Sequence, residues 1–493
     1  MASRWPCPSG PSPPPRRAFT SASGARQRRN RRMSSGWWMS PFPGFEPTPG
    51  RIQRLSKTRG RFAMSSFVVP AEPVRTALIG AGVRSRTVYA PMAEALAAWV
   101  KIVAVCDPVA DHADALADRL GVRAFYDIHG LVKARPMEAA LIVTPIPSLH
   151  SISVFLSSHG IHNLAETTWC SLLAQARQMI QVADRNRVIV RVGENFFRFP
   201  ADRIVQAIKR TGFVGEILRV ISYNDHTGYH NNSRWIVLAG TPDGARPGHQ
   251  PARHPTSVQS LTHTMPTASF HSSPERFHQA ETYRAHFITF LGNRLVMDHA
   301  SNVKGFLGRH ARPGYTEWQG TRGTIVYATP PGKAWNGEGE VRYCSDTALA
   351  TGTGGHDKHF PIVEEYQDGR WRRIYVDLPV GHLEYANPFF HLRPTPQFES
   401  RPWYQILVAE HVVDFVLAVR GLRQSEFDEQ DAMMSLMMEV AAHESELNDG
   451  KPVSLPLAGE VEAERAAAEN LRRQFGVDPM DVESMLAISY PKP

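Results

Sequence analysis

Short apolar runs alternate with helical patterns over the segment from Val74 to Val192. Runs typical of buried strands cover residues 74–79, 101–105, 123–126, 139–143, 161–164 and 188–192. Apolar residues recur at helical spacing over residues 83–98, 109–120, 148–158 and 171–185. Strands that alternate with helices through short connections form a parallel sheet with helices on both faces. The pattern therefore predicts an α/β fold that begins with a doubly wound parallel sheet.

The pattern changes in the second half of the chain. A helix over residues 201–211 leads into a strand over residues 216–224. Further strand runs, separated by turns, cover residues 282–291, 294–300, 315–318 and 323–327. Strands joined by short turns pair in antiparallel fashion, so we expect a mostly antiparallel sheet here. Residues 241–281 and 330–362 are expected to form long loops.

Two helices are expected towards the C-terminus. The first begins near Pro402 and ends at Gly421, with apolar residues on one face. The second has a stripe at helical spacing made of Met433, Leu436, Met437 and Val440. Methionine fills irregular gaps in protein cores, so this stripe is predicted to pack in the interior.

The most informative chemistry lies between the first strand and the first helix. Gly80 and Gly82 stand at this junction, where a nucleotide pyrophosphate binds in doubly wound folds. The first glycine permits a tight turn, and the second lets the backbone approach the phosphates. The following helix supplies free N–H groups. Ser85 stands where the third glycine of this fingerprint would be.

Asp107 follows the second strand and lies 25 residues after Gly82. An acid near this offset binds the ribose hydroxyls of the adenosine half of NAD. The alternative is an N-cap for the helix that follows, because aspartate also suits that position. No lysine or arginine follows closely enough to neutralise a 2′-phosphate, which favours NAD. Arg84 and Arg86 leave NADP open as the alternative.

The length and composition set further bounds. A chain of 493 residues can bury a large core and is expected to hold two domains plus extensions. Its apolar runs are shorter than a bilayer span requires, so we expect no membrane insertion. The four cysteines form no C-x-x-C pair, which indicates neither a disulfide framework nor a zinc cluster. A cytoplasmic location fits this cysteine usage.

The net charge of +8 is unevenly distributed. Residues 1–63 contain 13 basic residues and one acidic residue, so the rest of the chain has four more acidic than basic side chains. The N-terminal segment is rich in Pro, Ser, Gly and Arg, which predicts a disordered extension. We expect no nucleic-acid partner, because the arginine cluster has no structured elements around it. No export signal is predicted, because no apolar core follows the paired arginines.

With these motifs placed, the chain resembles the Gfo/Idh/MocA superfamily, the relatives of glucose–fructose oxidoreductase and inositol dehydrogenase. The resemblance covers about residues 74–456 and rests on segments in the family's order and spacing. These are Gly80–Gly82, Cys106–Pro108, Val143–Pro145 with His150, His162–Glu166, Gly193–Arg198, Gly212–Glu216 and Gly450–Pro456.

The resemblance implies a domain organisation. Residues 1–73 would be the disordered extension, and residues 74–197 an NAD(P)-binding Rossmann domain. Residues 198–456 would be a C-terminal α/β domain with a large, open, mostly antiparallel sheet used for oligomerisation. A C-terminal helix and tail would occupy residues 457–493. A homo-oligomer, dimer or tetramer, is therefore expected.

The resemblance also implies an activity, the oxidation or reduction of a sugar, an inositol or a related polyol with NAD(P). The residues expected at the cofactor are Gly80, Gly82, Val83, Arg84, Asp107, Thr144, Pro145, His150, Glu166 and Asn195.

Two family positions are changed in this chain. Where the family has Glu-Lys-Pro beside the nicotinamide, this sequence reads Glu166-Thr167-Thr168. Where the family has Gly-x-His-x-x-Asp at the reacting hydroxyl, it reads Gly228 to Ser233, with the histidine retained as His230 and the aspartate replaced by Ser233. Thr167 cannot supply the cation that a lysine would.

The remaining candidate for proton transfer is His230, because a histidine with an ordinary pKa titrates near neutrality. Tyr229 is a second candidate at this place. His226, Arg198 and Arg234 are expected to bind substrate. The alternative for His230 is a structural histidine satisfied by backbone groups. The histidines between residues 249 and 278 match no compact metal motif, so we expect no metal.

Three functions remain open at this point. The first is an NAD-dependent oxidoreductase acting on a sugar or polyol. The second is an NAD-dependent glycoside hydrolase or lyase, in which the cofactor oxidises the sugar transiently and is regenerated. The third is an NAD-binding sensor without catalysis. NADH formation with a sugar, cleavage of an aryl glycoside without net NADH, and binding without either reaction distinguish them.

Overall fold

The computed structural model of the chain describes most of residues 62–488. Residues 58–493 form one compact unit, separate from residues 1–57. The described residues are 62–63, 67–93, 95–224, 228–239, 253–265, 269–270, 277–278, 281–301, 305–306, 310–311, 314–329, 338–351, 355–391 and 402–488.

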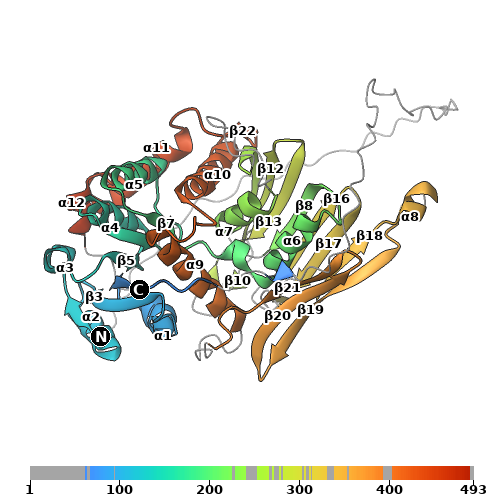
Figure 1. Ribbon diagram of the computed structural model, residues 1–493. Coiled ribbons are helices and arrows are strands. Elements are labelled where there is room, and N and C mark those ends of the chain that lie inside the picture. Colours follow the sequence, from blue (N-terminus) through green and yellow to red (C-terminus); the bar gives the residue numbers. More distant parts are fainter. Residues whose placement is uncertain are drawn as a thin grey trace, which may run out of the picture. The chain divides into compact units, whose positions relative to one another are not determined.

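The first sheet is parallel, has six strands and shows the doubly wound order β4-β3-β2-β5-β6-β7. Its strands are β2 (Val74–Ile79), β3 (Val100–Cys106), β4 (Arg123–Phe125), β5 (Ala139–Ile142), β6 (His162–Ala165) and β7 (Val190–Val192). The connecting helices include α2 (Ala110–Leu120), α3 (Ile128–Ala134), α4 (Ile146–Ser158) and α5 (Leu173–Asn186). Figure 1 shows them around the sheet. The predicted parallel fold is confirmed, and α3 is an addition that the pattern did not reveal.

The first helix is shorter and less regular than predicted. The expected helix over residues 83–98 is a π-helical turn, Ser85–Tyr89, followed by α1 (Ala90–Ala93). Pro91 lies in the middle of this segment and has no N–H to continue an α-helical ladder. Insertion of one extra residue into a turn is a common adjustment where that ladder is interrupted. The segment after α1 returns to β3 through turns.

The second sheet is large, open and mostly antiparallel. Its order is β1-β21-β20-β19-β18-β17-β16-β8-β13-β12-β9-β22, and the pairs β8–β13 and β1–β21 are parallel. The strands are β1 (Phe62–Ala63), β8 (Ile217–Asn224), β9 (Pro255–Met265), β12 (Glu281–Phe290), β13 (Arg294–Ser301), β16 (Gly314–Gly320), β17 (Gly323–Thr329), β18 (Glu338–Tyr343), β19 (Lys358–Gln367), β20 (Arg370–Leu378), β21 (Gly381–Ala386) and β22 (Val453–Ser454). Two small hairpins, β10–β11 (Ser269–Phe270, Phe277–His278) and β14–β15 (Gly305–Phe306, His310–Ala311), complete the strands.

The prediction of two long loops is partly wrong. β9 lies within residues 241–281, and β18, α8 (Asp346–Thr351) and part of β19 lie within residues 330–362. β9 reads Pro255-Thr-Ser-Val-Gln-Ser at its start, so few of its residues are large and apolar. Its pairing with β12 on one side and β22 on the other makes it a strand despite that weak signal.

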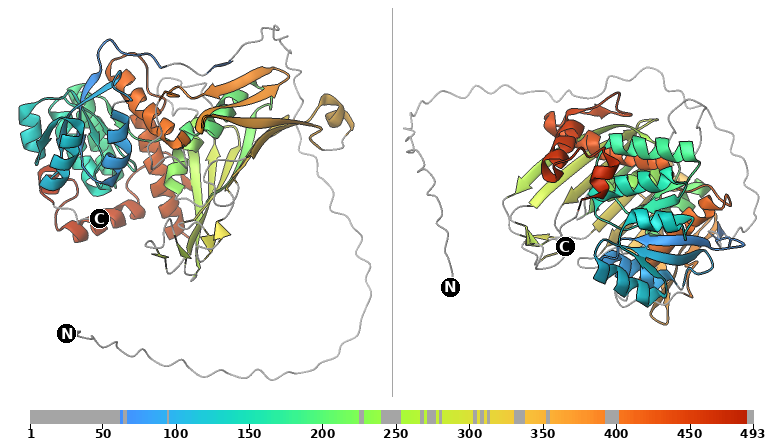
Figure 2. Two further views of the ribbon diagram at one scale, coloured as in Figure 1. Left: turned by 90° about the horizontal axis from the view of Figure 1, so that it is seen from below. Right: turned by 90° about the vertical axis from the view of Figure 1, so that its left-hand side faces the viewer.

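Four helices pack against the sheets, and two of them contact both. α6 (Pro200–Thr211) packs on β20 and β21, α7 (Gly228–Arg234) on β13, and α10 (Glu429–Leu447) on β9 and β7. α9 (Pro402–Val419) contacts both β6 and β20, so it lies between the two sheets (Figure 2). Leu436 and Met437 of α10 are buried, and Met433 and Val440 pack half-buried against the core, so the predicted stripe belongs to the interior. α11 (Glu462–Phe475) and α12 (Val482–Leu486) close the described chain.

The N-terminal extension ends earlier than predicted. Phe62 and Ala63 pair with Leu383 and Glu384 of β21. The Phe67 ring stacks on Phe389 with 5.4 Å between centroids, and the indole N–H of Trp99 donates to the Val68 carbonyl at 2.9 Å. Residues 62–63 and 67–73 therefore belong to the folded unit, and the expectation of disorder for residues 1–73 is wrong for these residues. Residues 1–61 lie outside the described residues.

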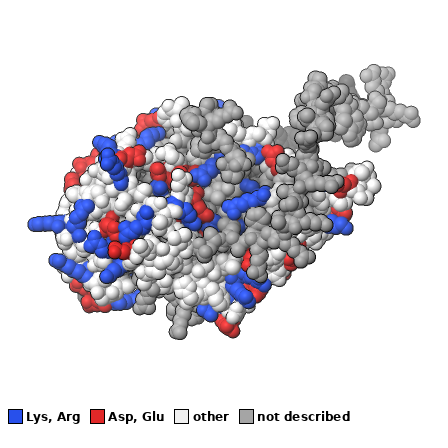
Figure 3. Space-filling model, in the orientation of Figure 1, with Lys and Arg blue, Asp and Glu red and all other residues white. Residues whose placement is uncertain are grey.

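The surface of the described part mixes charges of both signs. On the face shown in Figure 3, lysine and arginine side chains are interspersed with aspartate and glutamate. None of the helices in the described ranges is long and apolar enough to cross a membrane. The net positive charge of the whole chain is thus not gathered into one patch on the described part of this face.

Candidate functional site

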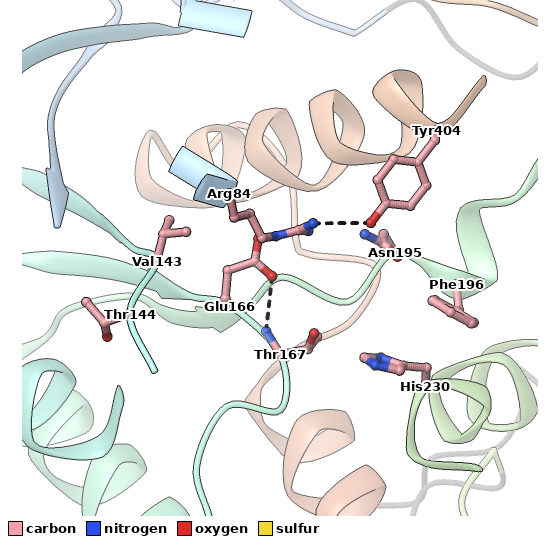
Figure 4. A pocket seen from close by; sticks show the side chains of 9 residues that line it. All are labelled: Arg84, Val143, Thr144, Glu166, Thr167, Asn195, Phe196, His230 and Tyr404. Atoms are coloured by element: carbon pink, nitrogen blue, oxygen red, sulfur yellow. Dashed lines mark hydrogen bonds and ion pairs between the residues drawn. The ribbon is translucent and has the colours of Figure 1, made fainter. Parts of the chain in front are cut away.

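A cavity of about 330 Å³ lies at the carboxyl ends of β5, β6 and β7 (Figure 4). Ligands bind at this edge in doubly wound sheets, where the strand order reverses. Loops after the strands contribute most of its walls, and α7 and α9 contribute one residue each. The lining residues are Arg84, Val143, Thr144, Glu166, Thr167, Asn195, Phe196, His230 and Tyr404.

The glycine turn beside this cavity has the geometry that the sequence predicts. Gly80 has φ +92°, and a Cβ there would lie 2.3 Å from the Val143 carbonyl oxygen. At Gly82 a Cβ would meet no heavy atom within 4 Å, so the backbone faces open space. The Ser85 hydroxyl donates to the Gly80 carbonyl at 2.5 Å. A serine therefore serves at the third position of the fingerprint by fastening the turn.

Asp107 binds the turn itself. Its Oδ2 accepts a hydrogen bond from the Ala81 N–H at 2.7 Å, and its Oδ1 accepts one from the Val109 N–H at 2.8 Å. Each carboxylate oxygen has a second lone pair, so the group can still accept from ribose hydroxyls. The open face of Gly82 and the acid at the end of β3 fit the pyrophosphate and ribose of NAD. The N-cap alternative is wrong, because Val109, and not Asp107, is the N-cap of α2, and the ribose contact of Asp107 stays a prediction.

Arg84 crosses the cavity from the glycine turn to α9. Its Nε donates to Glu166 Oε1 at 2.5 Å, and its terminal N–H donates to the Tyr404 hydroxyl at 3.3 Å. The Tyr89 hydroxyl also donates to Glu166 Oε1, at 2.5 Å, and lies 3.2 Å from His411 Nε2. Burial raises the pKa of the Tyr89 hydroxyl well above its ordinary value, and the Glu166 charge raises it further. The Thr167 N–H donates to the other oxygen, Oε2, at 3.3 Å, so Glu166 is held by three donors at one wall of the cavity.

His230 lines the cavity from α7. Its ring stacks on Phe196 with 4.9 Å between centroids and 17° between planes. Burial lowers the pKa of His230 to about 4, although the Glu166 charge opposes this shift. The expectation that His230 titrates near neutrality is therefore wrong, because sequence position gave no measure of burial. At neutral pH the imidazole is uncharged and can accept a proton.

A second buried acid lies behind this histidine. The Ser233 hydroxyl donates to Glu194 Oε2 at 3.0 Å, and the other oxygen, Oε1, has no hydrogen-bond partner among the described residues. Glu194 is 1% exposed and Ser233 is fully buried. Burial raises the pKa of the Glu194 carboxyl to about 8, and the Glu166 charge adds to the increase while the Ser233 hydrogen bond opposes it. Glu194 was not predicted as a site residue.

Three predicted site residues lie elsewhere. His150 is buried in α4, where its Nε2 lies 2.7 Å from Gln178 Oε1, and it does not line the cavity. Arg198 pairs with Asp414 and Glu426, and Arg234 binds both oxygens of Asp202 at 2.8 and 2.9 Å. Both arginines are buried, so these ion pairs occupy the guanidinium groups that the sequence assigned to substrate.

The other predicted residues divide into three groups. Arg84, Thr144, Glu166, Asn195 and His230 meet at the cavity. Gly80, Gly82, Val83, Asp107 and Pro145 are in the glycine turn or at the ends of the neighbouring strands, as expected for a nucleotide site. His226 lies outside the described residues, and of Tyr229 only the backbone, in α7, is described.

Phe196 and Tyr404 are lining residues that the sequence did not point to. Phe196 belongs to the Gly193–Arg198 segment, and its position next to Asn195 was the available signal. Tyr404 is in α9, far along the chain, and no motif marks it. Among the described residues, no group of three or more His, Cys, Asp or Glu side chains could hold a metal ion.

The comparison with known families gives one match. Residues 74–194 match the model of the oxidoreductase family with an NAD-binding Rossmann fold, GFO_IDH_MocA. This segment contains all six strands of the parallel sheet. The predicted cofactor class and the predicted first domain fold are therefore confirmed.

Individual proteins with related sequences or folds are also known. D-apiose dehydrogenase from Paraburkholderia graminis is 28% identical over 167 residues, which span 33% of this chain and 43% of that enzyme. An oxidoreductase from Agrobacterium radiobacter, solved with NAD+, L-tartaric acid and magnesium, has a TM-score of 0.54 at 15% identity and covers 77% of this chain and 98% of its own. The WlbA dehydrogenase from Bordetella pertussis, solved with NADH and UDP-GlcNAcA, has a TM-score of 0.53 at 15% identity and covers 79% of this chain and 100% of its own. At these identities the two structures establish similarity of fold, including the second sheet.

Proposed function

We propose, from the match of residues 74–194 to the oxidoreductase family with an NAD-binding Rossmann fold, that this chain is an NAD-dependent oxidoreductase acting on a CH–OH group of a sugar or related polyol. The supporting observation is the cavity at the glycine turn. It brings a neutral histidine, a carboxylate, a guanidinium and several hydroxyl and amide groups together. Such groups suit a ligand rich in hydroxyls. A sequence relative, D-apiose dehydrogenase, is named for a sugar substrate.

The side chains divide the work in this proposal. NAD, when bound, supplies the acceptor for the hydride of the alcohol carbon. His230 accepts the proton of the reacting hydroxyl at its imidazole, which is free of charge at neutral pH. Phe196 fixes the plane of that ring by stacking. Arg84 is the guanidinium among the lining residues, and it takes the place of the cation that Thr167 cannot provide.

The first test is a screen with the purified protein and NAD. Aldoses, polyols, anhydrosugars and sugar acids are offered in turn, and NADH is followed by its absorbance. We expect NADH to form with at least one of these compounds. His230→Asn should lower turnover by roughly a hundredfold or more while NAD binding is retained, because a general base contributes on that order.

His356 offers a matched histidine control. Its Nε2 lies 3.3 Å from Thr324 Oγ1 of β17, and it does not line the cavity. His356→Asn should leave turnover within about twofold of the wild type. A His230→Asn variant that turns over at the wild-type rate would remove His230 from the mechanism. If no compound of the panel yields NADH although NADH binds, the dehydrogenase proposal fails.

The lining residues support a second candidate as well. Among the described lining residues none is a lysine, and Thr167 occupies the wall next to Glu166. An NAD-dependent glycoside hydrolase or lyase oxidises its sugar only transiently, so it can use a different set of groups. This candidate predicts cleavage of an aryl glycoside that requires NAD and leaves no net NADH.

We infer in addition that the chain forms a homo-oligomer through the open face of its large sheet. Phe287, Met297 and Ile221 stand side by side in register across β12, β13 and β8, and each is half-buried. Their neighbours Ile288, Val296 and Val220 point to the opposite face and are fully buried. An apolar row of this kind at the centre of a wide sheet is suited to contact with a second copy.

A further inference from the structure

The buried carboxyl of Glu194 performs no task in the mechanism described above. It lies two residues after the end of β7 and precedes Asn195 and Phe196, which both line the cavity. Its partner Ser233 is three residues after His230, so both are on one side of the same helix, α7. Glu194 therefore connects the end of the parallel sheet to the helix that carries the candidate base.

The protonation state of Glu194 decides which way the hydrogen bonds of Ser233 run. Ser233 Oγ lies 3.0 Å from Glu194 Oε2 and 3.2 Å from the main-chain oxygen of His230. A serine hydroxyl has one hydrogen, so it can donate to only one of these oxygens. If the carboxyl is neutral, its O–H donates to Ser233, and Ser233 in turn donates to the His230 carbonyl. Both hydrogens are then used, and the contact holds α7, which carries His230, against the end of the parallel sheet.

The surroundings favour the neutral carboxyl. Glu194 is 1% exposed, and a buried carboxylate without a cation is costly. The Glu166 charge at the end of β6 raises the pKa of Glu194, and the Arg84 charge lowers the pKa of His230. A Cβ added at Gly193 would lie 3.5 Å from the His411 ring of α9, so this ring packs close to the backbone before Glu194. Arg198 does not pair with the Glu194 carboxyl: it donates to the main-chain oxygen of Glu194 at 3.5 Å, and its ion pairs are with other carboxylates, such as Asp414. The Glu439 charge of α10 raises the pKa of His230 and thus opposes the effect of burial.

We propose, on the basis of the function proposed above, that Glu194 is a positioning residue that holds α7 and its His230 in place through Ser233. Ionisation of Glu194 would direct the Ser233 hydrogen to the carboxylate and would leave a charge in a contact where Glu194 is only 1% exposed. The carboxylate would also draw water into the contact, so α7 would open.

Hydrogen–deuterium exchange of the peptide spanning residues 228–239 tests this directly, without any substrate. After correction for intrinsic exchange, the wild-type protection of α7 should fall roughly tenfold between about pH 6 and pH 9, because burial raises the pKa of Glu194 to about 8. Glu194→Gln keeps the shape and a hydrogen donor but cannot ionise. Its protection should stay within about twofold over the same range. Ser233→Ala should lower protection at both values.

A buried carboxyl outside the site gives the matched control. Glu464 is 3% exposed and accepts from the Ala174 N–H at 2.9 Å, so Glu464→Gln removes a buried acid elsewhere. It should leave the pH dependence of α7 exchange as in the wild type. The proposal is overturned if Glu194→Gln retains the wild-type loss of protection, or if Ser233→Ala leaves α7 as protected as before.

The link to catalysis is read from a pH profile. With a compound that gives NADH, the wild-type rate should decline above about pH 8, and Glu194→Gln should lose this alkaline decline. The same decline in both proteins would overturn the link to His230. If no compound gives NADH, the proposed function has failed, and the exchange result still decides the role of Glu194 in holding α7.

Discussion

Asp107 shows how one side chain serves both the fold and a ligand. Its two oxygens bind the N–H groups of Ala81 and Val109, which belong to the turns after β2 and β3. The carboxylate thereby fixes the shape of the glycine turn before any nucleotide arrives. A preformed site loses less conformational freedom on binding, which favours affinity.

Removal of this carboxylate should weaken NAD binding. For Asp107→Ala we expect a loss of about 1–3 kcal/mol, the scale of a charge-assisted hydrogen bond, measured by calorimetry. Asp127 is a suitable control, because it caps α3 through the Gly130 N–H and lies outside the glycine turn. Asp127→Ala should lower stability and leave the NAD affinity unchanged. Equal affinity of the Asp107 variant and the wild type would contradict this role.

At the scale of single residues, the sequence predicted the local features well and the distant ones poorly. Gly80 and Gly82 were identified because their role depends on neighbours in the chain. Arg198 and Arg234 were assigned to substrate because their partners, Asp414 and Asp202, cannot be recognised from the sequence around either arginine. The pKa of His230 was placed too high because its burial arises from the tertiary contact with Phe196.

At the scale of elements, the strands of the parallel sheet were predicted within two residues at each end. Each is a short apolar run bounded by turn residues, and this signal is strong where both faces are covered. The antiparallel strands β9, β18, β19, β20 and β21 were missed. In β9, β18 and β19 most side chains are half-buried or exposed and many are polar, so pairing rather than composition determines these strands.

The segment that precedes β2 is the element whose role the sequence misjudged. Because Phe67 stacks on Phe389 and the Val68 carbonyl accepts from Trp99, a chain that begins at Glu72 should be less stable than one that begins at Thr58. We expect a difference of roughly 1–3 kcal/mol, the value of burying a large apolar side chain, visible as a lower melting temperature.

A chain that begins at Met64 is informative between these two. It keeps Phe67 and loses the two residues of β1, so it isolates the contribution of their pairing with β21. If the chain that begins at Glu72 melts at the same temperature as the one that begins at Thr58, residues 62–71 do not stabilise the folded unit.

At the scale of the whole molecule, the open face of the large sheet sets the expected assembly. Phe287→Glu combined with Met297→Glu would place two charges in the apolar row and should convert the oligomer to a monomer. Light scattering of the eluted protein gives the mass directly. Leu291→Glu is the control, because Leu291 is 53% exposed in the turn between β12 and β13. If the Leu291→Glu variant also dissociates into monomers, or if the wild-type protein is itself a monomer, an interface on this face is contradicted.

Arg84 reaches from the glycine turn to Tyr404 on α9, the helix that contacts both sheets. A nucleotide seated on that turn would compete with Glu166 and Tyr404 for the same guanidinium. Occupancy of the nucleotide site is therefore energetically linked to the cavity wall formed by Glu166 and Tyr404. Such a linkage is reciprocal: whatever factor NADH imposes on the affinity for the proposed sugar substrate, that substrate must impose on the affinity for NADH.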